Sequence, residues 1–498
     1  MNRQTIQNGV NELRLGDLPG FPRFYADYAE CAEKALRFYR CSPDIESMAT
    51  HARIIRPGVS FSGDFGQILQ SLNCSKASPA NLNRLQDPEI RIVWVTQPAS
   101  LFGGAFTQIL KCVTAIKLAD ELGQRGIPTI PVCEIGPGIR NARDRCTLNL
   151  LDIEGTLQKL VLRNIEAHAL AGGEDFLIPP HIKELFARIG PMVSNLPGSD
   201  TLQLLKELYH PGTLLSAASE HFWAKLFADH GLVVLNFHGE VMGGFLGMEL
   251  KRLGITPVEI AEGMRRREED LAQSGYEIQG EEYSSTVCDH PQILPFLRHA
   301  VLPVVAVIAD PDEMELMGLL GPIYDKLGII QPVVWPRASA SVINGRTQKI
   351  LERYHVSYVD ALCGKKEVRG WISSDAGGEQ AINQFRSLSQ RIRDKMDVLR
   401  DLSKADDHLK KSVDSCGEKI LYQISKLIDR LDASSRAKRA AFERRSERLF
   451  NELLPAGLLQ EQGLSAAHFL FHYSAGMIQN LGQRLDVLRH RHQLIFAG

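Results

Sequence analysis

Five apolar runs in the chain each end in polar residues whose side chains can bind a ligand or move a proton. These ends are residues 96–98 (Thr-Gln-Pro), 133–134 (Cys-Glu), 236–238 (Asn-Phe-His), 310–313 (Asp-Pro-Asp-Glu) and 337–339 (Arg-Ala-Ser). In an open parallel sheet, ligands bind beyond the carboxyl ends of the strands. The set therefore predicts a site for a small polar substrate that carries an amine and a carboxylate. The alternative is that these ends touch no ligand, because polar residues end most strands of any α/β protein.

A pair of glycines, Gly103 and Gly104, stands between the first apolar run and a predicted helix that starts near Ala105. Glycines at this place allow close backbone approach, and the free N–H groups of a helix start favour an anion. The stretch matches neither G-x-G-x-x-G nor the Gly-Lys-Ser/Thr of a P-loop. The pair predicts phosphate or carboxylate binding, and the alternative is a tight turn between strand and helix.

Metal and thiol chemistry find less support in the sequence. Glu220, His221 and His230 do not form the H-E-x-x-H pattern of a helical zinc site, so we predict no metal site. Cys133, at a strand end, is either a nucleophile near His238 or a buried cysteine that acts as a small hydrophobic residue.

The elements that must position these residues follow from the pattern of the apolar runs. Between residues 86 and 380 the runs are continuous rather than alternating, which is typical of strands buried on both faces of a parallel sheet flanked by helices. Roughly ninety residues of mostly helical pattern separate the second run from the third, too many for one crossover. We predict an α/β core at 86–380, with a helical insertion at about 145–230 and a preceding N-terminal helical segment at 1–85.

The pattern changes again in the last quarter of the chain. Leu388, Ile392, Met396 and Leu399 are spaced by three and four residues, which defines a narrow apolar seam. Residues 382–452 contain one glycine and no proline. We therefore predict a coiled coil at 381–452, formed either between chains or by one chain folding back, and a C-terminal segment at 453–498.

Composition bounds the class of protein. A chain of 498 residues should form two or more lobes, and its 44% hydrophobic and 23% charged residues are those of a globular protein. The net charge of −2 gives no general attraction to nucleic acid or to anionic membranes. No apolar run reaches the length of a bilayer span, and the start lacks the apolar core of a secretory signal. The nine cysteines form no C-x-x-C pair, so we predict reduced thiols and a cytoplasmic protein.

Three stretches together resemble the bacillithiol-biosynthesis cysteine ligase family. "QPASLFGGAFTQILKCVTAIKLADEL" is similar to the family's first strand, loop and helix, and "LGIIQPVVWPRASASVIN" is similar to its VVxPRAS strand and turn. "LLPAGLLQEQ" is similar to the FPNGGLQER motif that follows its coiled coil. The order, the spacing and the total length also agree, so the resemblance covers most of the chain.

The resemblance implies a fold and an activity. The fold would be a Rossmann-like parallel sheet core with a helical insertion and a long C-terminal coiled coil that makes a homodimer. The activity would be the last step of low-molecular-weight thiol synthesis, in which the carboxylate of cysteine is joined to the amino group of a glucosaminyl-malate. ATP, with magnesium, is the expected activating agent, through an acyl-adenylate or an acyl-phosphate. No nucleic acid or membrane partner is expected.

The resemblance also implies roles for residues. The loop from Gln97 to Gly104 would line the site, and Arg337 with Ser339 would hold a carboxylate or phosphate, since arginine can bind either through two hydrogen bonds. The motif after the coiled coil would bring that end of the chain toward a ligand. The predicted residues are catalytic Glu134 and His238, and binding residues Gln97, Phe102, Gly103, Gly104, Asn236, Arg337, Ser339, Gly457, Gln460 and Glu461.

The sequence also departs from the family pattern. Where the family carries an acidic, histidine-containing run, this chain reads "CEIGPGIRNAR", which keeps Glu134 and adds Arg140 and Arg143. The aspartate expected after the third strand is Asn236. The leading interpretation is a cysteine ligase, and the alternative is a catalytically inactive small-molecule-binding or scaffold dimer that keeps the fold. Convergence of Glu134, His238 and Arg337 would favour catalysis.

Overall fold

The structure is a computed structural model. It describes residues 12–55, 79–85, 87–136, 145–163, 175–236, 256–277, 299, 302–354, 356–363, 377–402 and 405–497. His238, Arg140 and Arg143 lie outside these residues. The chain divides into two compact units, one made of Met1–Gly345 with Leu453–Gly498 and the other of Arg346–Glu452.

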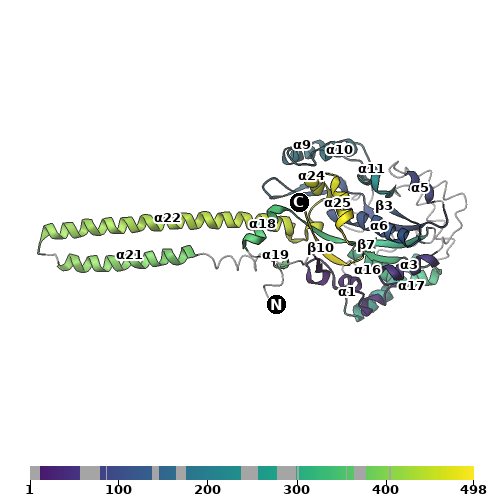
Figure 1. Ribbon diagram of the computed structural model, residues 1–498, viewed down its shortest axis with the longest axis horizontal. Coiled ribbons are helices and arrows are strands. Elements are labelled where there is room, and N and C mark those ends of the chain that lie inside the picture. Colours follow the sequence, from purple (N-terminus) through teal and green to yellow (C-terminus); the bar gives the residue numbers. More distant parts are fainter. Residues whose placement is uncertain are drawn as a thin grey trace. The chain divides into compact units, whose positions relative to one another are not determined.

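A five-stranded parallel sheet forms the centre of the first unit (Figure 1). Its order is β6-β3-β2-β7-β8, and every neighbouring pair is parallel. Numbered along the chain this order is 3-2-1-4-5, that of a Rossmann-like sheet, and it reverses direction between β2 and β7. The predicted fold class is confirmed. The strands are β2 (Arg91–Pro98), β3 (Thr129–Gly136), β6 (Val233–Asn236), β7 (Val304–Ala309) and β8 (Val333–Pro336).

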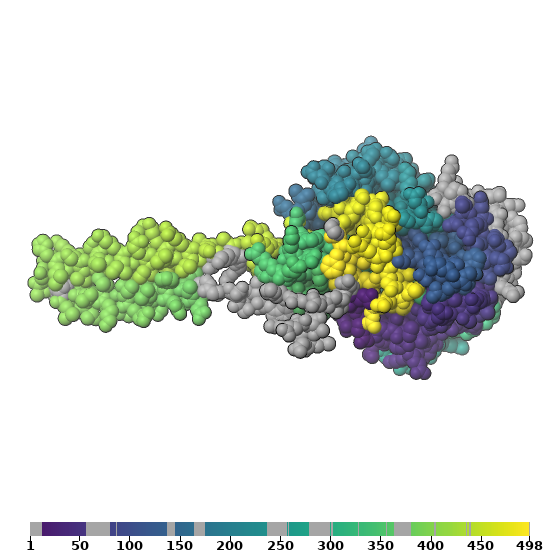
Figure 2. All heavy atoms as spheres, in the orientation of Figure 1, coloured from purple at the N-terminus to yellow at the C-terminus, as the bar shows by residue number. Residues whose placement is uncertain are grey.

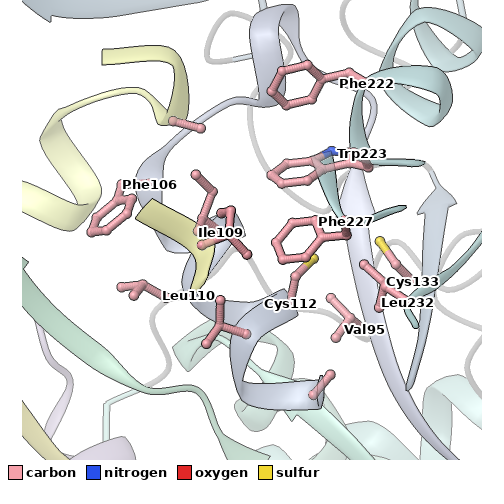
Figure 3. Packing of buried hydrophobic residues seen from close by; sticks show 14 of the residues in the cluster. Val95, Phe106, Ile109, Leu110, Cys112, Cys133, Phe222, Trp223, Phe227 and Leu232 are labelled. Carbon is pink, nitrogen blue, oxygen red and sulfur yellow. The ribbon is translucent and has the colours of Figure 1, made fainter. Parts of the chain in front are cut away.

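One face of the sheet is covered by helices from three parts of the chain. Val93 and Val95 of β2 pack in a buried apolar cluster with α6 (Phe106–Gln124), α11 (Leu215–Leu226) and α24 (Ala466–Tyr473). Figure 3 shows part of this cluster, where side chains of α6 and α11 meet over the sheet. The C-terminal segment therefore belongs to the core of the first unit.

The opposite face carries a second apolar cluster. Ile92 and Trp94 of β2 join residues of α1 (Arg23–Ala29), α13 (Pro257–Gln273) and α16 (Pro311–Leu319) there. Because successive strand residues alternate between the two clusters, both faces of β2 are buried, which explains its continuous apolar run.

The segment predicted as a helical insertion starts with strands. β4 (Thr147–Leu151) and β5 (Leu157–Val161) form an antiparallel hairpin, which the sequence pattern did not predict. The helices α9 (Ile182–Val193) and α10 (Asp200–Leu208) follow, and α11 completes the insertion. Five-residue strands are too short to stand out beside the longer helical pattern.

A second, three-stranded sheet joins the two ends of the chain. β10 (Arg491–Phe496) pairs in parallel with β9 (Ser339–Ile343) and antiparallel with β1 (Glu12–Arg14). Figure 2 shows the C-terminal residues, in yellow, on the surface of the first unit beside the blue-green insertion. The described parts of the predicted segments 1–85 and 453–498 thus lie in the same unit as the core.

The second unit is a helical hairpin. α21 (Gly377–Leu402) and α22 (Asp407–Leu453) lie side by side in Figure 1. Gly417 leaves room for Met396, whose Cε would lie 2.7 Å from a Cβ at that position. Arg400 Nε donates to Asp414 Oδ1 at 2.7 Å. The predicted coiled coil is therefore confirmed, and the chain folds back on itself.

Among the described helices none is long and apolar enough to cross a bilayer. The remaining described elements are short. They are α2 (Glu33–Leu36), α3 (Ile45–Ile54), α5 (Pro79–Arg84), α17 (Gly321–Leu327), α18 (Gly345–Tyr354), α19 (Tyr358–Cys363), α23 (Gln460–Gly463) and α25 (Gly476–Arg484), with short 3-10 turns at Leu15–Asp17, Leu101–Gly103, Ala228–His230 and Pro455–Gly457.

Gly198 tests the packing between the insertion and the C-terminal segment. A Cβ at this position would lie 1.8 Å from the carbonyl oxygen of Leu470, so Gly198→Ala forces two backbones apart. We expect a loss of about 1–3 kcal/mol in the free energy of unfolding of the first unit, as for other overpacked sites. Urea unfolding followed by tryptophan fluorescence measures it. Gly190→Ala is the control, since the nearest atom there is at 4.0 Å; equal stability of the two variants would contradict the packing.

Candidate functional site

A cavity of about 380 Å³ opens at the point where the sheet order reverses. Thr96 and Pro98 at the end of β2 line it, as do Asp310 and Glu313 after β7 and Arg337 after β8. Ligands of open α/β sheets bind at this switch point, because the chains leaving adjacent strands diverge there. The cavity is therefore the candidate site.

Lys111 of α6 brings a buried positive charge to the cavity wall. Its side chain is 1% exposed, and Nζ lies 2.7 Å from Glu313 Oε2, 2.8 Å from the carbonyl oxygen of Thr96 and 3.7 Å from Asp310 Oδ2. Burial alone would lower the pKa of Lys111, but the charges of Glu313 and Asp310 outweigh it, and the pKa lies above the usual lysine value. Lys111 is a fixed ammonium group.

Arg337 is the second buried cation of the wall. Nε donates to Asp310 Oδ1 at 2.5 Å, and a terminal guanidinium nitrogen lies 2.9 Å from Glu461 Oε1. Burial opposes its charge, yet Glu461 and Asp310 raise the pKa of Arg337 above its usual range. Asp310 therefore lies between both cations, and two protein carboxylates already neutralise the arginine that was predicted to hold a substrate carboxylate.

Behind Arg337, buried polar residues fasten the C-terminal segment to β9. Ser339 Oγ donates to Glu461, at 3.0 Å from both of its oxygens, and lies 2.7 Å from His492 Nδ1. Gln460 exchanges two hydrogen bonds with the backbone of Val342, at 2.7 and 3.0 Å. Ser339, Gln460 and Glu461 are not among the residues that line the cavity; they hold Arg337 in place.

Of the two predicted catalytic residues, Glu134 lies away from the cavity lining, and His238 lies outside the described residues. Glu134 accepts a hydrogen bond from Trp94 Nε1 at 3.1 Å, is fully buried, and does not line the cavity. Asn236 Nδ2 donates to Ser216 Oγ and Glu220 Oε2, each at 3.2 Å, and also lies outside the cavity lining.

Most of the predicted loop packs in the core. Gln97 Nε2 donates to the carbonyl oxygen of Gln108 at 2.8 Å, and the Phe102 ring lies 5.3 Å from that of Phe186 and 5.0 Å from that of Tyr209. Gly104 does line the cavity. Gly457 is exposed between two cavity residues, Ala456 and Leu458.

The glycine pair supports a tight turn rather than a phosphate cradle. Gly103 has φ +83°, and a Cβ there would lie 2.5 Å from Phe222, so packing requires the glycine. The first N–H of α6, that of Phe106, donates to the carbonyl oxygen of Leu464 at 3.0 Å. The Phe106 N–H is therefore not available to an anion.

Sequence reasoning missed several cavity residues. Lys111 stands in an apolar helix pattern between Leu110 and Cys112, and a lone lysine on a buried helix face signals a buried ion pair. Arg145 and Lys159 carry no such signal; Leu148 and Leu150 alternate at the period of a strand, which could have indicated β4 between them.

The C-terminal segment fixes the hairpin at the cavity wall. Asn149 donates through its backbone N–H to Ser465 Oγ at 2.9 Å and through Nδ2 to the carbonyl oxygen of Gly463 at 3.1 Å. The Leu151 N–H donates to His468 Nδ1 at 3.3 Å. His468 is thus a buried acceptor, and burial, with a further contribution from His472, keeps its pKa well below the usual histidine value.

Together the sheet order and the position of the cavity define a Rossmann-like α/β protein with a switch-point site. Two family models describe it further: that of the N-terminal Rossmann-like domain of bacillithiol biosynthesis BshC matches residues 11–287, and that of the BshC C-terminal coiled-coil domain matches residues 340–497. The chain therefore belongs to the BshC family of bacillithiol biosynthesis.

Relatives named "Putative cysteine ligase BshC" are similar to the chain over most of its length. The relative from Koribacter versatilis is 24% identical, over 94% of this chain and 96% of the relative. That from Salinibacter ruber is 21% identical, over 84% of each, and that from Geobacillus thermodenitrificans is 24% identical, over 97% of this chain and 100% of the relative.

Lys111→Met tests the buried charge pair. The substitution keeps the volume of the side chain but leaves Glu313 and Asp310 without the ammonium, which should lower the free energy of unfolding by about 3–5 kcal/mol. The double variant Lys111→Met/Glu313→Gln removes a carboxylate as well and should recover part of the loss. Urea unfolding of the single and double variants provides the comparison. A single variant within 1 kcal/mol of wild type, against the roughly 3–5 expected, would rule out the pairing.

His468 makes stability depend on pH. The unfolded chain takes up a proton at this histidine near pH 6.5, while the folded chain resists it, so the free energy of unfolding should fall as the pH drops below about 6.5. His468→Asn keeps an acceptor for the Leu151 N–H without titrating, and should make this decrease shallower. Unfolding at several pH values between about 7.5 and 5 measures both slopes. Identical slopes would show that His468 is not the neutral acceptor.

Proposed function

We propose that this protein is a ligase that forms the amide bond between the carboxylate of cysteine and the amino group of glucosaminyl-malate, in the last step of bacillithiol synthesis. The observation that carries the proposal is the switch-point cavity, where Asp310 and Glu313 stand beside Lys111 and Arg337. Such a site can attract an amine and a carboxylate at once. The relatives' name, "Putative cysteine ligase BshC", supports the cysteine ligase part of this proposal.

In this proposal, each wall of the cavity has a part in amide formation. The carboxylates at 310–313 attract the ammonium of the amine substrate, and Asp312, which lines the cavity, takes its proton. The free amine would then attack the carboxyl carbon of activated cysteine, so that the C–N bond forms as the C–O bond to a phosphate or AMP leaving group breaks. Arg337, at the same wall, is paired with Asp310 and Glu461, so its part is to orient Asp310 toward the amine.

We also propose that ATP with magnesium takes part. A free carboxylate does not form an amide in water without activation, and ATP would supply a phosphoryl or adenylyl group for that purpose. Beside the turn at Gly103 and Gly104, the Phe106 N–H already donates to Leu464 and is not available to a phosphate. We therefore assign no step to a residue acting on the nucleotide.

The proposed protein is a homodimer that works in the cytoplasm on small molecules, without a nucleic-acid or membrane partner. Support for the dimer comes from large apolar side chains that the helical hairpin leaves exposed. Leu402 is 78% exposed and Tyr422 is 57% exposed, although both stand on helices with a coiled-coil seam. Other exposed apolar residues of the hairpin are Val398, Leu399, Leu409, Ile420 and Leu427.

A mass-spectrometric assay tests the ligase. Purified protein is incubated with cysteine, glucosaminyl-malate, ATP and magnesium, and the thiol product is followed together with AMP and ADP. AMP would indicate an adenylate, and ADP an acyl-phosphate. Asp312→Asn should lower kcat by about 100-fold, the usual contribution of a proton-transfer group.

The matched control is Asp229→Asn, at an exposed aspartate outside the cavity, which should keep wild-type activity. Absence of product from folded wild-type protein would overturn the ligase proposal and leave the binding or scaffold role. Product formation with an unaffected Asp312→Asn variant would remove Asp312 from the mechanism.

A further inference from the structure

The β4–β5 hairpin presents two different faces. Alternate residues line the cavity, while those between them pack in the apolar core. The cavity-lining residues are Thr147, Asn149, Leu157 and Lys159 of the hairpin and Arg145, two residues before β4; the core residues are Leu148, Leu150, Leu151 and Leu160. Asn149 and Lys159 are directly paired across the two strands, so their side chains share one face. The hairpin therefore has a largely polar face toward the cavity, which forms one wall of it, and an apolar face toward the core.

This wall adds two positive charges to the cavity, those of Arg145 and Lys159. Lys111 and Arg337 are bound by the protein's own carboxylates, which raise the pKa of each. Arg145 is 97% buried, since only 3% of it is exposed, and burial lowers the pKa of its guanidinium more than its neighbours Cys146 and Asp175 raise it. An anion bound in the cavity beside Arg145 would offset part of this cost of burial.

The two walls also favour opposite ends of a substrate. Asp310, Asp312 and Glu313 line the cavity at the end of β7, and they attract an ammonium group and repel carboxylates. Arg145 and Lys159 line it on the hairpin and attract carboxylates. An amine substrate that also carries carboxylates therefore has one favourable orientation, with its nitrogen at the sheet edge and its carboxylates at the hairpin.

We propose that the polar face of the hairpin, with Arg145 and Lys159 as its cations, is the subsite that binds the carboxylate groups of the amine substrate. The proposal rests on the proposed ligase function for the identity of that substrate. Arg145 can hold one carboxylate through two parallel hydrogen bonds. Lys159 acts as a point charge for a second carboxylate, and Thr147 with Asn149, between them on the same face, adds hydrogen-bonding groups.

Equilibrium binding of malate tests the subsite without requiring catalysis. Calorimetric titration of the whole protein with malate, in the absence of cysteine and ATP, should show binding. Lys159→Gln should weaken it at least about tenfold, the effect of losing one charge-assisted interaction. Lys159 is exposed, so this variant should fold normally, and Lys183→Gln on α9, at an exposed lysine outside the cavity, should bind like wild type.

A second variant and a kinetic readout complete the test. Arg145→Lys keeps the buried charge but removes the planar fork, and it should also weaken malate binding. In the ligase assay, both variants should raise KM for glucosaminyl-malate at least about fivefold while KM for cysteine stays unchanged.

The outcomes separate this proposal from the ligase proposal. Malate binding that depends on Lys159 and Arg145 in a protein that makes no product would support the subsite and reject the ligase. Wild-type protein that binds no malate, or folded variants that bind it as wild type does, would overturn the subsite even if the thiol product forms.

Discussion

Arg337 and Glu461 are both buried, so each charge needs the other as its partner. The docking of the C-terminal segment in the first unit depends on this ion pair. Their side chains are 1% and 0% exposed and lie 2.9 Å apart. A single unpaired charge at this depth costs on the order of several kcal/mol, so neither residue can take its place without the other. Arg337 follows the last strand of the parallel sheet, and Glu461 follows the helical hairpin. The pair therefore fixes where the returning chain must dock.

The ion pair between Arg337 and Glu461 also determines where a carboxylate of the candidate site lies. Asp310 accepts from Arg337 and lies near Lys111, so the position of one carboxylate depends on two cations that the sheet and α6 hold in place. Hairpin residues reach the cavity because Gly463, Ser465 and His468 bind them. The C-terminal segment supplies no catalytic group in this view. It binds Arg337 on one wall of the cavity and the hairpin on the other.

The sequence predicts the sheet well and the site only in part. Continuous apolar runs reveal strands buried on both faces, because each strand residue must be apolar whichever way it points. Position at a strand end does not reveal which way a side chain points, however. Thr96 lines the cavity, whereas Gln97, the next residue, faces the opposite side and bonds to α6. Gly104 and Arg337 reach the cavity, and Gln460 and Glu461 act one layer behind it, a distinction that only tertiary packing makes.

The second unit also shapes how the chain reaches its native state. Residues 346–452 are inserted between β9 and the C-terminal segment, and the Thr347 hydroxyl donates to Glu452 at the two ends of this insertion. A helical hairpin forms from contacts close in sequence, and once formed it brings its ends together. The conformational entropy of closing the long loop between β9 and β10 is then already lost before these strands meet. During synthesis on the ribosome, the first unit cannot be completed until β10 has been made. The helical hairpin can form earlier, and it then places the chain that leads to β10 close to the end of β9.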